Sequence, residues 1–277
     1  MSARQVHAVM AAALSNPQLI ERWRQDPESL REHGLAPEEL DLNALWKFAG
    51  LAVKIRHNGL RGELPWTFRL LGVLGLEAEV FASYGSFLAK EGIALGQSVD
   101  ARARDLSVFL ERWLDCGKPD HSLVWDLLRH ELALMQLSNA TEPDPSIRAT
   151  APDKEERPRA STVPQVCGSI VLHAMQCDPR IVIDRLRHAT PPLHTVPRED
   201  SHICYWRPSA ASDLRIIRLD ALGYYLLSHS DGSASAGDLS RRLVGGRRVA
   251  PALLGALAEL RAAGLLFFRA PQRKEPG

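Results

Sequence analysis

The chain has 277 residues, enough for two ordinary domains that each bury a hydrophobic core of their own. Its 34 basic and 33 acidic residues give a formal net charge of +1. Because a dedicated nucleic-acid binder usually shows a basic excess, this balance argues mildly against that class of protein.

The N-terminus, MSARQVHAVMAAALSNP, is interrupted by polar residues too often to form the apolar region of a secretory signal. No apolar run elsewhere approaches the ~18 residues that a membrane-spanning helix needs. We therefore expect a soluble, cytoplasmic protein that makes no contact with a membrane.

Two short helices are predicted near the N-terminus, over residues 17–25 and 27–33. Each begins with a proline, whose missing N–H costs nothing at the first helical position. The preceding side chains, Asn16 and Asp26, are suited to cap a helix N-terminus. Gly34 is the natural stop of the second helix, because glycine adopts the left-handed conformation without strain.

A longer helix follows, which Asp41 can cap and which we expect to lie at the centre of its domain. Apolar residues recur along it with the 3.6-residue period of an α-helix, and others widen the stripe. The periodic residues are Leu42, Leu45, Ala49, Ala52 and Val53, and the widening ones are Phe48, Leu51 and Ile55.

Three further amphipathic helices are expected in the first half of the chain. They cover residues 77–90, 100–115 and 121–137, and Asp120 can cap the last of them. Together with the earlier helices they predict an all-helical domain over residues 1–140, packed as an orthogonal or bundle-like array.

Most aromatic residues of this half are expected in the helical core, where large apolar side chains bury the most surface. Trp23 is the exception, since Arg22 and Arg24 flank it and favour a place near the surface, where it could mark a partner contact. The expected core set is Trp46, Trp66, Trp113, Trp125, Phe48, Phe81 and Phe109.

The composition changes abruptly after the helical half. Residues 138–164 are rich in Pro, Ser, Thr and charge, and they cannot bury a core of their own. We expect a flexible, surface-exposed linker over residues 141–164. Residues 180–188 are ambiguous, because their apolar positions suit a short helix as well as a strand.

The rest of the chain, residues 165–277, predicts a small winged-helix-like domain. Strands are expected over residues 167–175, 203–207 and 214–219, which can form a three-stranded antiparallel sheet. Three helical patterns follow, and the apolar run 265–268 closes the unit as a further strand. The fold class is therefore expected to be α+β, with an all-helical domain followed by a sheet and three helices.

No catalytic or metal-binding motif stands out in the sequence. It has no Gly-rich phosphate loop in the required context, no GxSxG elbow and no HExxH pair. The four cysteines are scattered without a CxxC pair, which indicates reduced and mostly buried thiols. We therefore expect a chain without catalytic residues, metal ligands or a cofactor of its own.

A group of polar residues lies at the end of the long apolar helix. His57 stands there with Arg56, Asn58 and Arg61, and one interpretation is a surface that faces a partner or its active site. The alternative is local: a cationic helix end complements the helix dipole, while Asn58-Gly59 makes the turn.

The winged-helix outline has two common uses, gripping nucleic acid and gripping a peptide. Arg241-Arg242 and Arg247-Arg248 could contact phosphates. The helix that would read a DNA groove, however, runs over residues 250–263 and carries a single basic residue, Arg261. Because base readout needs polar donors, this Ala/Leu-rich helix favours peptide capture, and a DNA-binding winged-helix regulator is the alternative.

A peptide can add to the edge strand 214–219 through main-chain hydrogen bonds and place its side chains against the apolar helix. Side chains of one parity along the strand are expected to pack inward and those of the other to face out, and the sequence leaves open which is which. The expected peptide contacts are Leu214, Ile216, Ile217 and Arg218 of the strand and Leu253, Leu257 and Arg261 of the helix.

Residues 214–269 resemble the PqqD-like recognition elements of peptide-modifying pathways. In that family a strand leads into a helix of the form Leu-x-x-x-Gly/Ala-x-x-Leu-Leu, and an Asp-Gly turn, two helices and a Gly-Leu-Leu strand follow. The resemblance implies a winged-helix fold that binds a precursor peptide. The matching positions are Leu219 to Gly223, Leu226-Leu227, Asp231-Gly232, Asp238-Leu239, and Leu260 through Gly264-Leu265-Leu266.

The helical half resembles the TglI- and MbnC-like partner subunits of multinuclear non-haem iron enzymes that act on cysteine in a precursor peptide. The resemblance lies in LWKFAGLAVKIRHNGLRGELPWTFRLL and EVFASYGSFLAKEG, and it covers nearly the whole chain except residues 138–164. It implies that the iron and the chemistry belong to a partner enzyme of the TglH or MbnB type. This chain is then a required subunit that is not an enzyme on its own.

The resemblance to TglI-like subunits and the resemblance to MbnC-like subunits imply different reactions. A TglI-like subunit serves the oxidative excision of the β-methylene from a C-terminal cysteine of a carrier peptide, on the way to 3-thiaglutamate. An MbnC-like subunit serves the formation of an oxazolone and a thioamide instead.

Overall fold

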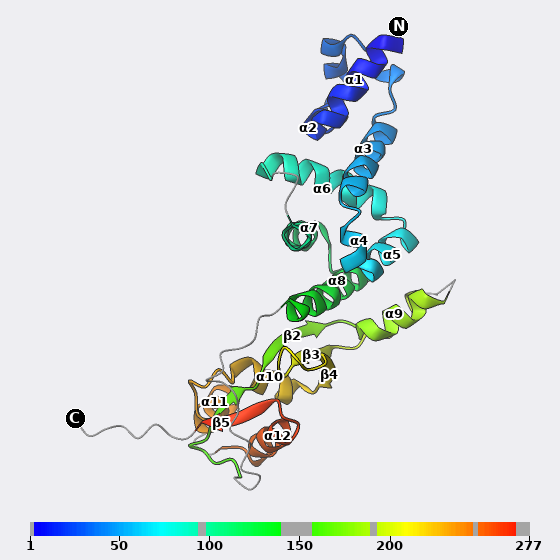
Figure 1. The fold of residues 1–277 in the computed structure, drawn as a ribbon. Coiled ribbons are helices and arrows are strands. Elements are labelled where there is room, and N and C mark those ends of the chain that lie inside the picture. The colour runs from blue at the N-terminus through cyan, green and yellow to red at the C-terminus, as the bar shows by residue number, and fades with distance from the viewer. Residues whose placement is uncertain (1–2, 94–97, 140–156, 189–192, 246–248, 270–277) are drawn as a thin grey trace, which may run out of the picture. The chain divides into compact units, whose positions relative to one another are not determined.

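The structure, a computed structural model, describes residues 3–93, 98–139, 157–188, 193–245 and 249–269. Helices make up the N-terminal part, and small antiparallel sheets are interspersed with helices in the C-terminal part (Figure 1), which confirms the predicted α+β class. The chain forms two compact units. The helical unit comprises Met1–Glu131 and Val182–His194, and the sheet unit comprises Leu132–Ile181 and Thr195–Gly277.

The boundary between the units falls inside two helices, α8 (Pro119–Ser138) and α9 (Pro179–Arg187). The last part of α8 therefore belongs to the sheet unit, although the sequence suggested a helical domain over residues 1–140. Residues 182–194 likewise belong to the helical unit and not to a domain over residues 165–277.

The helical unit is built from short helices that begin and end at local signals in the sequence. Besides α8, its helices are α1 (Ala3–Ser15), α2 (Pro17–Gln25), the 3₁₀ helices Pro27–His33 and Pro37–Glu39, α3 (Leu42–Arg56), α4 (Leu60–Glu63), α5 (Pro65–Val73), α6 (Glu77–Glu91) and α7 (Val99–Trp113). Asn16 caps α2 by accepting a hydrogen bond from the Gln18 N–H at 3.2 Å. Asp41 caps α3 in the same way, and Gly34, with a φ of 76°, ends the first 3₁₀ helix.

Two helix starts lie a residue or so from their predicted places. Pro119 is the first residue of α8, so Asp120 lies in the first turn of the helix and not at its cap. Ser98 caps α7 by accepting a hydrogen bond from the Ala101 N–H at 3.2 Å. A proline at the first helical position explains the shift at α8, because its fixed φ already suits the helix.

Trp23 is fully buried in the first core of the helical unit. The prediction that it lies near the surface was therefore wrong. Its arginine neighbours leave in other directions: Arg22 pairs with Glu32 at 2.9 Å. The Arg24 guanidinium lies over the Trp46 ring, 4.1 Å from its centroid. Charged neighbours in a sequence thus do not predict exposure on a helix, because adjacent residues point about 100° apart.

One side of α3 packs against α6, and Gly50 allows the two helices to approach closely. A Cβ atom at Gly50 would lie only 2.6 Å from the Ala82 nitrogen. Leu45, Ala49 and Val53, which belong to the predicted stripe, are buried on α3 as expected.

The other side of α3 exposes large apolar residues. Phe48, Leu51 and Ile55, spaced three and four residues apart and therefore on one face, are 50%, 42% and 73% exposed. We call these three residues the α3 apolar strip. The prediction that they widen the buried stripe, and that Phe48 lies in the core, was wrong. Of the other expected core aromatics, Phe81 and Phe109 are buried, and Trp46, Trp66, Trp113 and Trp125 are half-buried.

A buried carboxylate of α8 holds the start of α5 in the helical unit. The two oxygens of Glu131 accept hydrogen bonds from the N–H groups of Trp66 and Thr67, each at 2.8 Å. Both N–H groups belong to the first turn of α5, where no helical carbonyl is available to them. Burial raises the pKa of Glu131, and hydrogen bonds from Thr67 and Trp66 oppose that rise.

Among the described residues, no single helix is long and apolar enough to cross a membrane. The helices α5 and α6 reach the required length and hydropathy only as a pair, and they are bent by 117° at the break between them. Many of their apolar side chains, such as Phe68, Leu70 and Phe81, are buried in the helical unit.

The sheet unit contains the predicted three-stranded antiparallel sheet followed by three helices. Its strands are β1 (Val163–Val166), β2 (Ser169–Met175), β3 (Ser201–Arg207), β4 (Arg215–Leu219) and β5 (Leu266–Arg269), and its helices are α10 (Ala221–His229), α11 (Ala236–Val244) and α12 (Pro251–Ala262). The sheet has the order β2-β3-β4, and β5 pairs with β1 in a second sheet of two strands.

Strand β1 corrects the predicted extent of the linker over residues 141–164. Val163 lies opposite Arg269 and Val166 lies opposite Leu266, so the end of that segment is a strand. The signal was weak because Pro164 sits inside the strand, and its partner β5 comes much later in the chain. Residues 141–156 of the expected linker lie outside the described residues.

Both faces of the three-stranded sheet are covered by apolar clusters. One face packs on the helices that follow the sheet, and the other packs on the end of α8. The first cluster includes Cys204, Trp206, Leu226, Leu227, Leu239, Leu253, Leu257, Leu260 and Leu266. The second includes Ala133, Leu137, Met175, Ile203 and Tyr205.

Arg207, the last residue of β3, joins the end of α8 to the turn between β3 and β4. Its Nη1 donates to the carbonyls of Leu137 and Ser138 at 2.8 and 3.1 Å, where a helix end leaves carbonyls without helical partners. Its Nε donates to the Ser212 carbonyl at 3.3 Å, and its Nη2 donates to the Ala210 carbonyl. One side chain thus holds two parts of the sheet unit together.

Candidate functional site

Strand β4 is an edge strand of the three-stranded sheet. It pairs with β3 on one side, and on its other side no strand pairs with it among the described residues. An edge of this kind presents a row of N–H and C=O groups to which an extended peptide can add as a new strand. Strand β2 forms the other edge of the same sheet.

The register of β4 shows on which face of the sheet each of its side chains lies. Ile216 lies opposite Tyr205 and Arg218 opposite Ile203, so these residues share the face that packs on the end of α8. Ile217 lies opposite Cys204 on the other face. An apolar cluster covers part of each face, and an exposed arginine lies on each face as well, Arg218 on the first and Arg215 on the second.

The two isoleucines and their neighbour Leu214 are nevertheless only partly buried. Leu214 and Ile216 pack against the α8 cluster, and Ile217 packs against the cluster of the three helices. The strand therefore keeps some apolar surface on each face beside its edge. Such surface is what a docked strand needs for its own alternating side chains.

The helix α12 contributes to the core more than the sequence predicted. Leu253 and Leu257 are 1% and 0% exposed, so their side chains support the helix from inside and do not line its surface. This corrects the expectation that they contact a peptide. Arg261 is half-buried, and its guanidinium lies over the Phe268 ring, 4.8 Å from the centroid.

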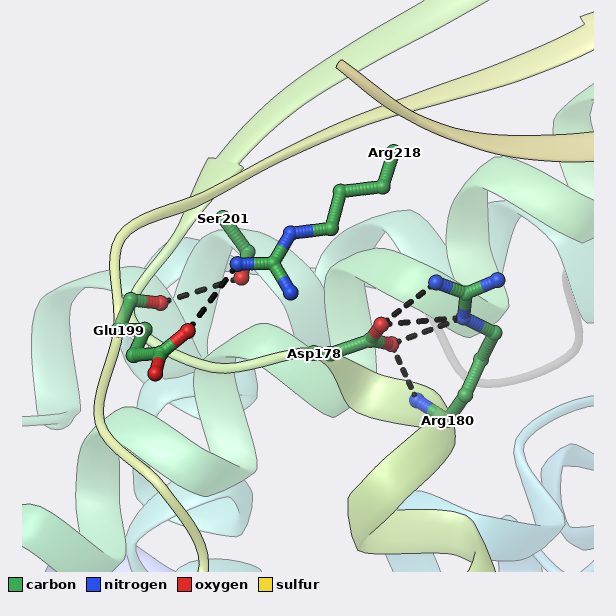
Figure 2. Close-up of polar contacts among 5 residues, drawn as sticks. All are labelled: Asp178, Arg180, Glu199, Ser201 and Arg218. Carbon is green, nitrogen blue, oxygen red and sulfur yellow. Dashed lines mark hydrogen bonds and ion pairs between the residues drawn. The ribbon is translucent and has the colours of Figure 1, made fainter. Parts of the chain in front are cut away.

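A polar cluster in the sheet unit is formed by residues of β3, of β4, of the segment before β3 and of the start of α9. Figure 2 shows Asp178 beside Arg180, and Arg218 reaching to Glu199. The Arg180 guanidinium donates to both Asp178 oxygens, at 2.6 Å for the shortest contact. The Arg218 Nη2 donates to Glu199 at 3.2 Å, and Ser201 Oγ donates to the Glu199 carbonyl at 3.1 Å.

Asp178 also explains why residues 180–188 are helical. Its side chain accepts a hydrogen bond from the Arg180 N–H at 3.0 Å, and Pro179 begins α9. This is the Asx-Pro pattern of Asn16-Pro17, and it was the signal that could have resolved the ambiguity in the sequence. Sequence reasoning missed Asp178, Arg180 and Glu199 as members of a site, because Glu199 and Arg218 come from segments distant in the chain from Asp178 and Arg180.

The electrostatics of this cluster favour ionised carboxylates. Burial alone would raise the pKa of Asp178, but hydrogen bonds from Arg180 and the charges of Arg180 and Arg218 outweigh it, and the pKa is lowered. The guanidinium of Arg218 therefore lies within electrostatic range of Asp178 as well as of Glu199.

The polar group at the end of α3 has mainly a local role. His57 is buried, and its Nδ1 lies 2.9 Å from the Val53 carbonyl, which corrects the view of it as an exposed residue. Its ring meets Tyr84 edge-on, with centroids 5.2 Å apart. Asn58 is exposed in the turn after the helix, and Arg56 is the last residue of α3.

Arg61 is held by an acidic partner in the helical unit. Its Nη2 lies 2.9 Å from one oxygen of Glu77, and Lys54 lies 2.6 Å from the other. Glu77 is the first residue of α6, where a negative charge is favourable. Of the predicted partner-facing group, Asn58 and Arg61 are thus exposed. They lie beyond the end of α3, Asn58 in the turn and Arg61 in α4, whereas the α3 apolar strip lies on α3 itself.

The cysteines differ in environment. Cys177 and Cys204 are buried, Cys167 is half-buried and Cys116 is exposed. Burial raises the pKa of Cys204 to about 12, so that thiol stays protonated at neutral pH. Within the described ranges, no group of three or more His, Cys, Asp or Glu side chains is arranged to hold a metal ion.

The residues considered for DNA contact do not converge on a described surface. Arg241 and Arg242 are exposed on α11, and Arg241 is paired with Asp238. Arg247 and Arg248 lie outside the described residues. A surface hollow elsewhere, in the helical unit, is lined mostly by polar residues and lacks the apolar walls of a typical ligand site. Its lining residues are Glu21, Arg24, Gln25, Pro27, Leu42 and Asn43.

Comparison with known proteins adds no relative: the chain matches no protein-family model, and no curated protein matches it. The candidate site therefore rests on the geometry of the sheet unit, with the edge of β4, its partly buried isoleucines and the polar cluster at its end.

We predict that Leu257→Ala lowers the free energy of unfolding by about 2–5 kcal/mol, because it empties a fully buried position in the core under α12. Leu243→Ala, at a 45% exposed position on α11, serves as the matched control and should change it by less than ~0.5 kcal/mol. Urea unfolding of both variants is the measurement. A Leu257 variant as stable as the control would contradict the buried role of this residue.

We predict that Asp178→Asn destabilises the protein near neutral pH by about 1 kcal/mol, because it removes the charge that Arg180 binds. The pKa of Asp178 is lowered in the folded state, so its contribution is present above the ordinary value of 3.8 and is lost as the pH falls through the lower folded pKa. The difference in unfolding free energy between wild type and variant should therefore shrink below about pH 4. Asp213→Asn, at an exposed residue before β4, is the control.

Proposed function

We propose that this chain is a non-catalytic subunit that binds a ribosomally synthesised precursor peptide along β4. The subunit then presents the C-terminal cysteine of that peptide to an iron-dependent oxygenase subunit. The observation that carries the proposal is the edge of β4, with which no further strand pairs in the described parts of the chain. Its isoleucines remain partly exposed although both faces of the sheet are covered. A ligand that gains main-chain hydrogen bonds from this edge must be an extended peptide.

Strand addition suits a subunit that must hold a peptide without reading it in full. Main-chain hydrogen bonds are the same for every sequence, so affinity comes from the edge and selectivity from the side chains beside it. The reacting cysteine can then lie far from the docked segment. A flexible tether raises its effective concentration at the catalytic site to the millimolar range.

The chemistry is assigned to the partner. The resemblance to TglI-like subunits implies a TglH-type enzyme, with iron in the partner, that excises the β-methylene of the cysteine on the way to 3-thiaglutamate. The resemblance to MbnC-like subunits implies oxazolone and thioamide formation as the alternative. In either case this chain supplies binding and orientation, which fits a site made of main chain and isoleucines.

The helical unit offers a surface for that partner. The α3 apolar strip exposes three large hydrophobic side chains on one face, together with Asn58 and Arg61 beyond the end of the helix. Apolar side chains ringed by polar ones are typical of the centre of a protein interface. We assign this strip to the oxygenase subunit.

We predict that a proline in β4 weakens peptide binding. Neighbouring residues of a strand point their N–H groups to opposite sides, so Ile216→Pro and Ile217→Pro remove one donor to β3 and one donor from the open edge. The variant that keeps the native melting temperature should bind a fluorescein-labelled precursor peptide that ends in cysteine about tenfold more weakly in fluorescence polarisation.

Val171→Pro on β2, the other edge strand, is the control and should leave the affinity unchanged if it folds. Wild-type affinity in both β4 variants would mean that the strand is not the docking edge. Tight binding of duplex DNA that falls steeply with salt in a mobility-shift titration would instead support a winged-helix regulator.

We predict that Phe48→Ser combined with Ile55→Ser weakens binding to the proposed iron-dependent oxygenase subunit by about tenfold or more, because central apolar residues dominate interface energy. Sedimentation velocity of the mixed proteins measures this. Val108→Ser, at a 42% exposed site on α7, is the matched control. Equal weakening by the control and the double variant would show that the partner does not use this strip.

A further inference from the structure

The strand β4 carries one positive charge before its two isoleucines and one after them, in the order Arg215-Ile216-Ile217-Arg218. Because side chains alternate along a strand, the two arginines lie on opposite faces of the sheet. Arg218 shares its face with Ile203, and Arg215 shares the other face with Trp206. Both arginines are exposed at their own ends of the strand.

The Arg218 side chain can exchange its acidic partner, Glu199, for an acidic group of a ligand. It is 48% exposed, and its ion pair with Glu199, which is 68% exposed, is a single contact at 3.2 Å. An exposed pair of this kind contributes little to stability, so a carboxylate from a ligand can replace Glu199 at small cost. Arg180 differs, because Asp178 holds it through a two-pronged contact and is itself only 8% exposed.

The Arg215 side chain lies over the Trp206 ring, 5.4 Å from its centroid. Within the described part of the chain, no carboxylate lies within ion-pair distance of it. The ring fixes the guanidinium beside the strand and leaves its N–H groups for an acceptor.

Three other acidic residues near the strand must be considered as competitors. Asp220, just after β4, is committed to capping α10, because it accepts a hydrogen bond from the Gly223 N–H at 2.6 Å. Asp213 lies before the strand in the turn, and Asp200 precedes β3; both are exposed. Neither of these two forms an ion pair with Arg215 or Arg218 among the described residues.

We propose that the edge of β4 selects a peptide segment with two acidic residues that enclose two apolar residues. An added strand places its side chains directly beside those of β4, about 5 Å away. Acidic side chains then meet Arg215 on one face and Arg218 on the other, while the apolar pair covers Ile216 and Ile217. The pattern acid–apolar–apolar–acid reads the same in both directions, so it holds for a parallel or an antiparallel peptide.

This inference rests on the proposed docking of a peptide on β4, and it adds the chemical class of the segment that is recognised. The spacing is the critical element. Two acids three positions apart lie on opposite faces of a strand, as the two arginines do. Two acids four positions apart lie on the same face, where only one arginine is present.

The test uses the full chain and four fluorescein-labelled peptides that have the same flanking residues and differ only at their centres. The centres are Glu-Leu-Val-Glu, Gln-Leu-Val-Gln, Lys-Leu-Val-Lys and Glu-Leu-Val-Val-Glu. In polarisation at low salt, the first should bind about fivefold more tightly than the second and the fourth, and still more tightly than the third. The preference should diminish in 0.5 M salt, because exposed charges are screened.

Charge reversal in the protein identifies the residues. The double variant Arg215→Glu with Arg218→Glu should prefer the lysine peptide over the glutamate peptide, whereas Arg242→Glu, an exposed change on α11, should keep the wild-type order. Thermal melting checks that each variant folds. A reversed preference cannot arise from a loss of folding, since an unfolded site would bind neither peptide.

The outcomes separate this inference from the proposed function. Equal binding of all four peptides, with the sensitivity to proline in β4 retained, would overturn the acidic pattern and leave strand addition intact. A glutamate preference unchanged in the double variant would overturn the assignment to the two arginines. Failure of the four peptides and of the cysteine-ending precursor peptide to bind would overturn both the pattern and the proposed function.

Discussion

The sheet unit depends on a three-stranded sheet that is covered on both faces. The end of α8 packs on one face, and the helices α10–α12 pack on the other. Arg207 maintains this arrangement, because one guanidinium binds the last carbonyls of α8 and the turn that leads into β4. With both faces occupied, the main chain at the sheet edges is the part of the sheet left for a ligand. The packed faces hold the strands of such a sheet in place, and the edge strand presents N–H and C=O groups to which a further strand can add.

Because the faces are covered, the apolar side chains of α12 pack in the core and do not form an apolar groove for a ligand. Leu253 and Leu257 of α12 hold the helix against the sheet from inside. The proposed ligand-facing surface is instead composed of the edge of β4, the exposed parts of Ile216 and Ile217, and the arginines beside them. A docked strand would therefore be selected by charge at two points and by hydrogen bonding along its length. The buried thiol of Cys204, with its raised pKa, belongs to the core of the unit and takes no part in this surface.

Local signals in the sequence were reliable where a few neighbouring residues decide the outcome. Asn16-Pro17, Asp41 and Gly34 marked helix ends correctly, because a cap or a left-handed glycine acts within one turn. The same signal at Asp178-Pro179 would have settled α9. Predictions that depend on distant partners were less successful. Trp23 is buried and the α3 apolar strip is exposed, because exposure depends on which helices cover which side. Periodicity shows that a helix has an apolar stripe, but it does not show how much of that stripe other helices cover.

For the candidate site, the sequence by itself determined that residues 214–219 form a strand, that an Ala/Leu-rich helix follows, and that Arg218 lies on that strand. These properties follow from alternation and helical period, which are encoded within each segment. Only the tertiary structure decided that β4 is at the edge, that both of its faces are covered, and that Asp178, Arg180 and Glu199 gather near Arg218. Strand order, burial and ion pairs are set by contacts between segments far apart in the chain. The energy of those contacts cannot be inferred from any single segment. For the same reason the sequence did not predict β1 within the expected linker, because its pairing with β5 involves a segment far along the chain.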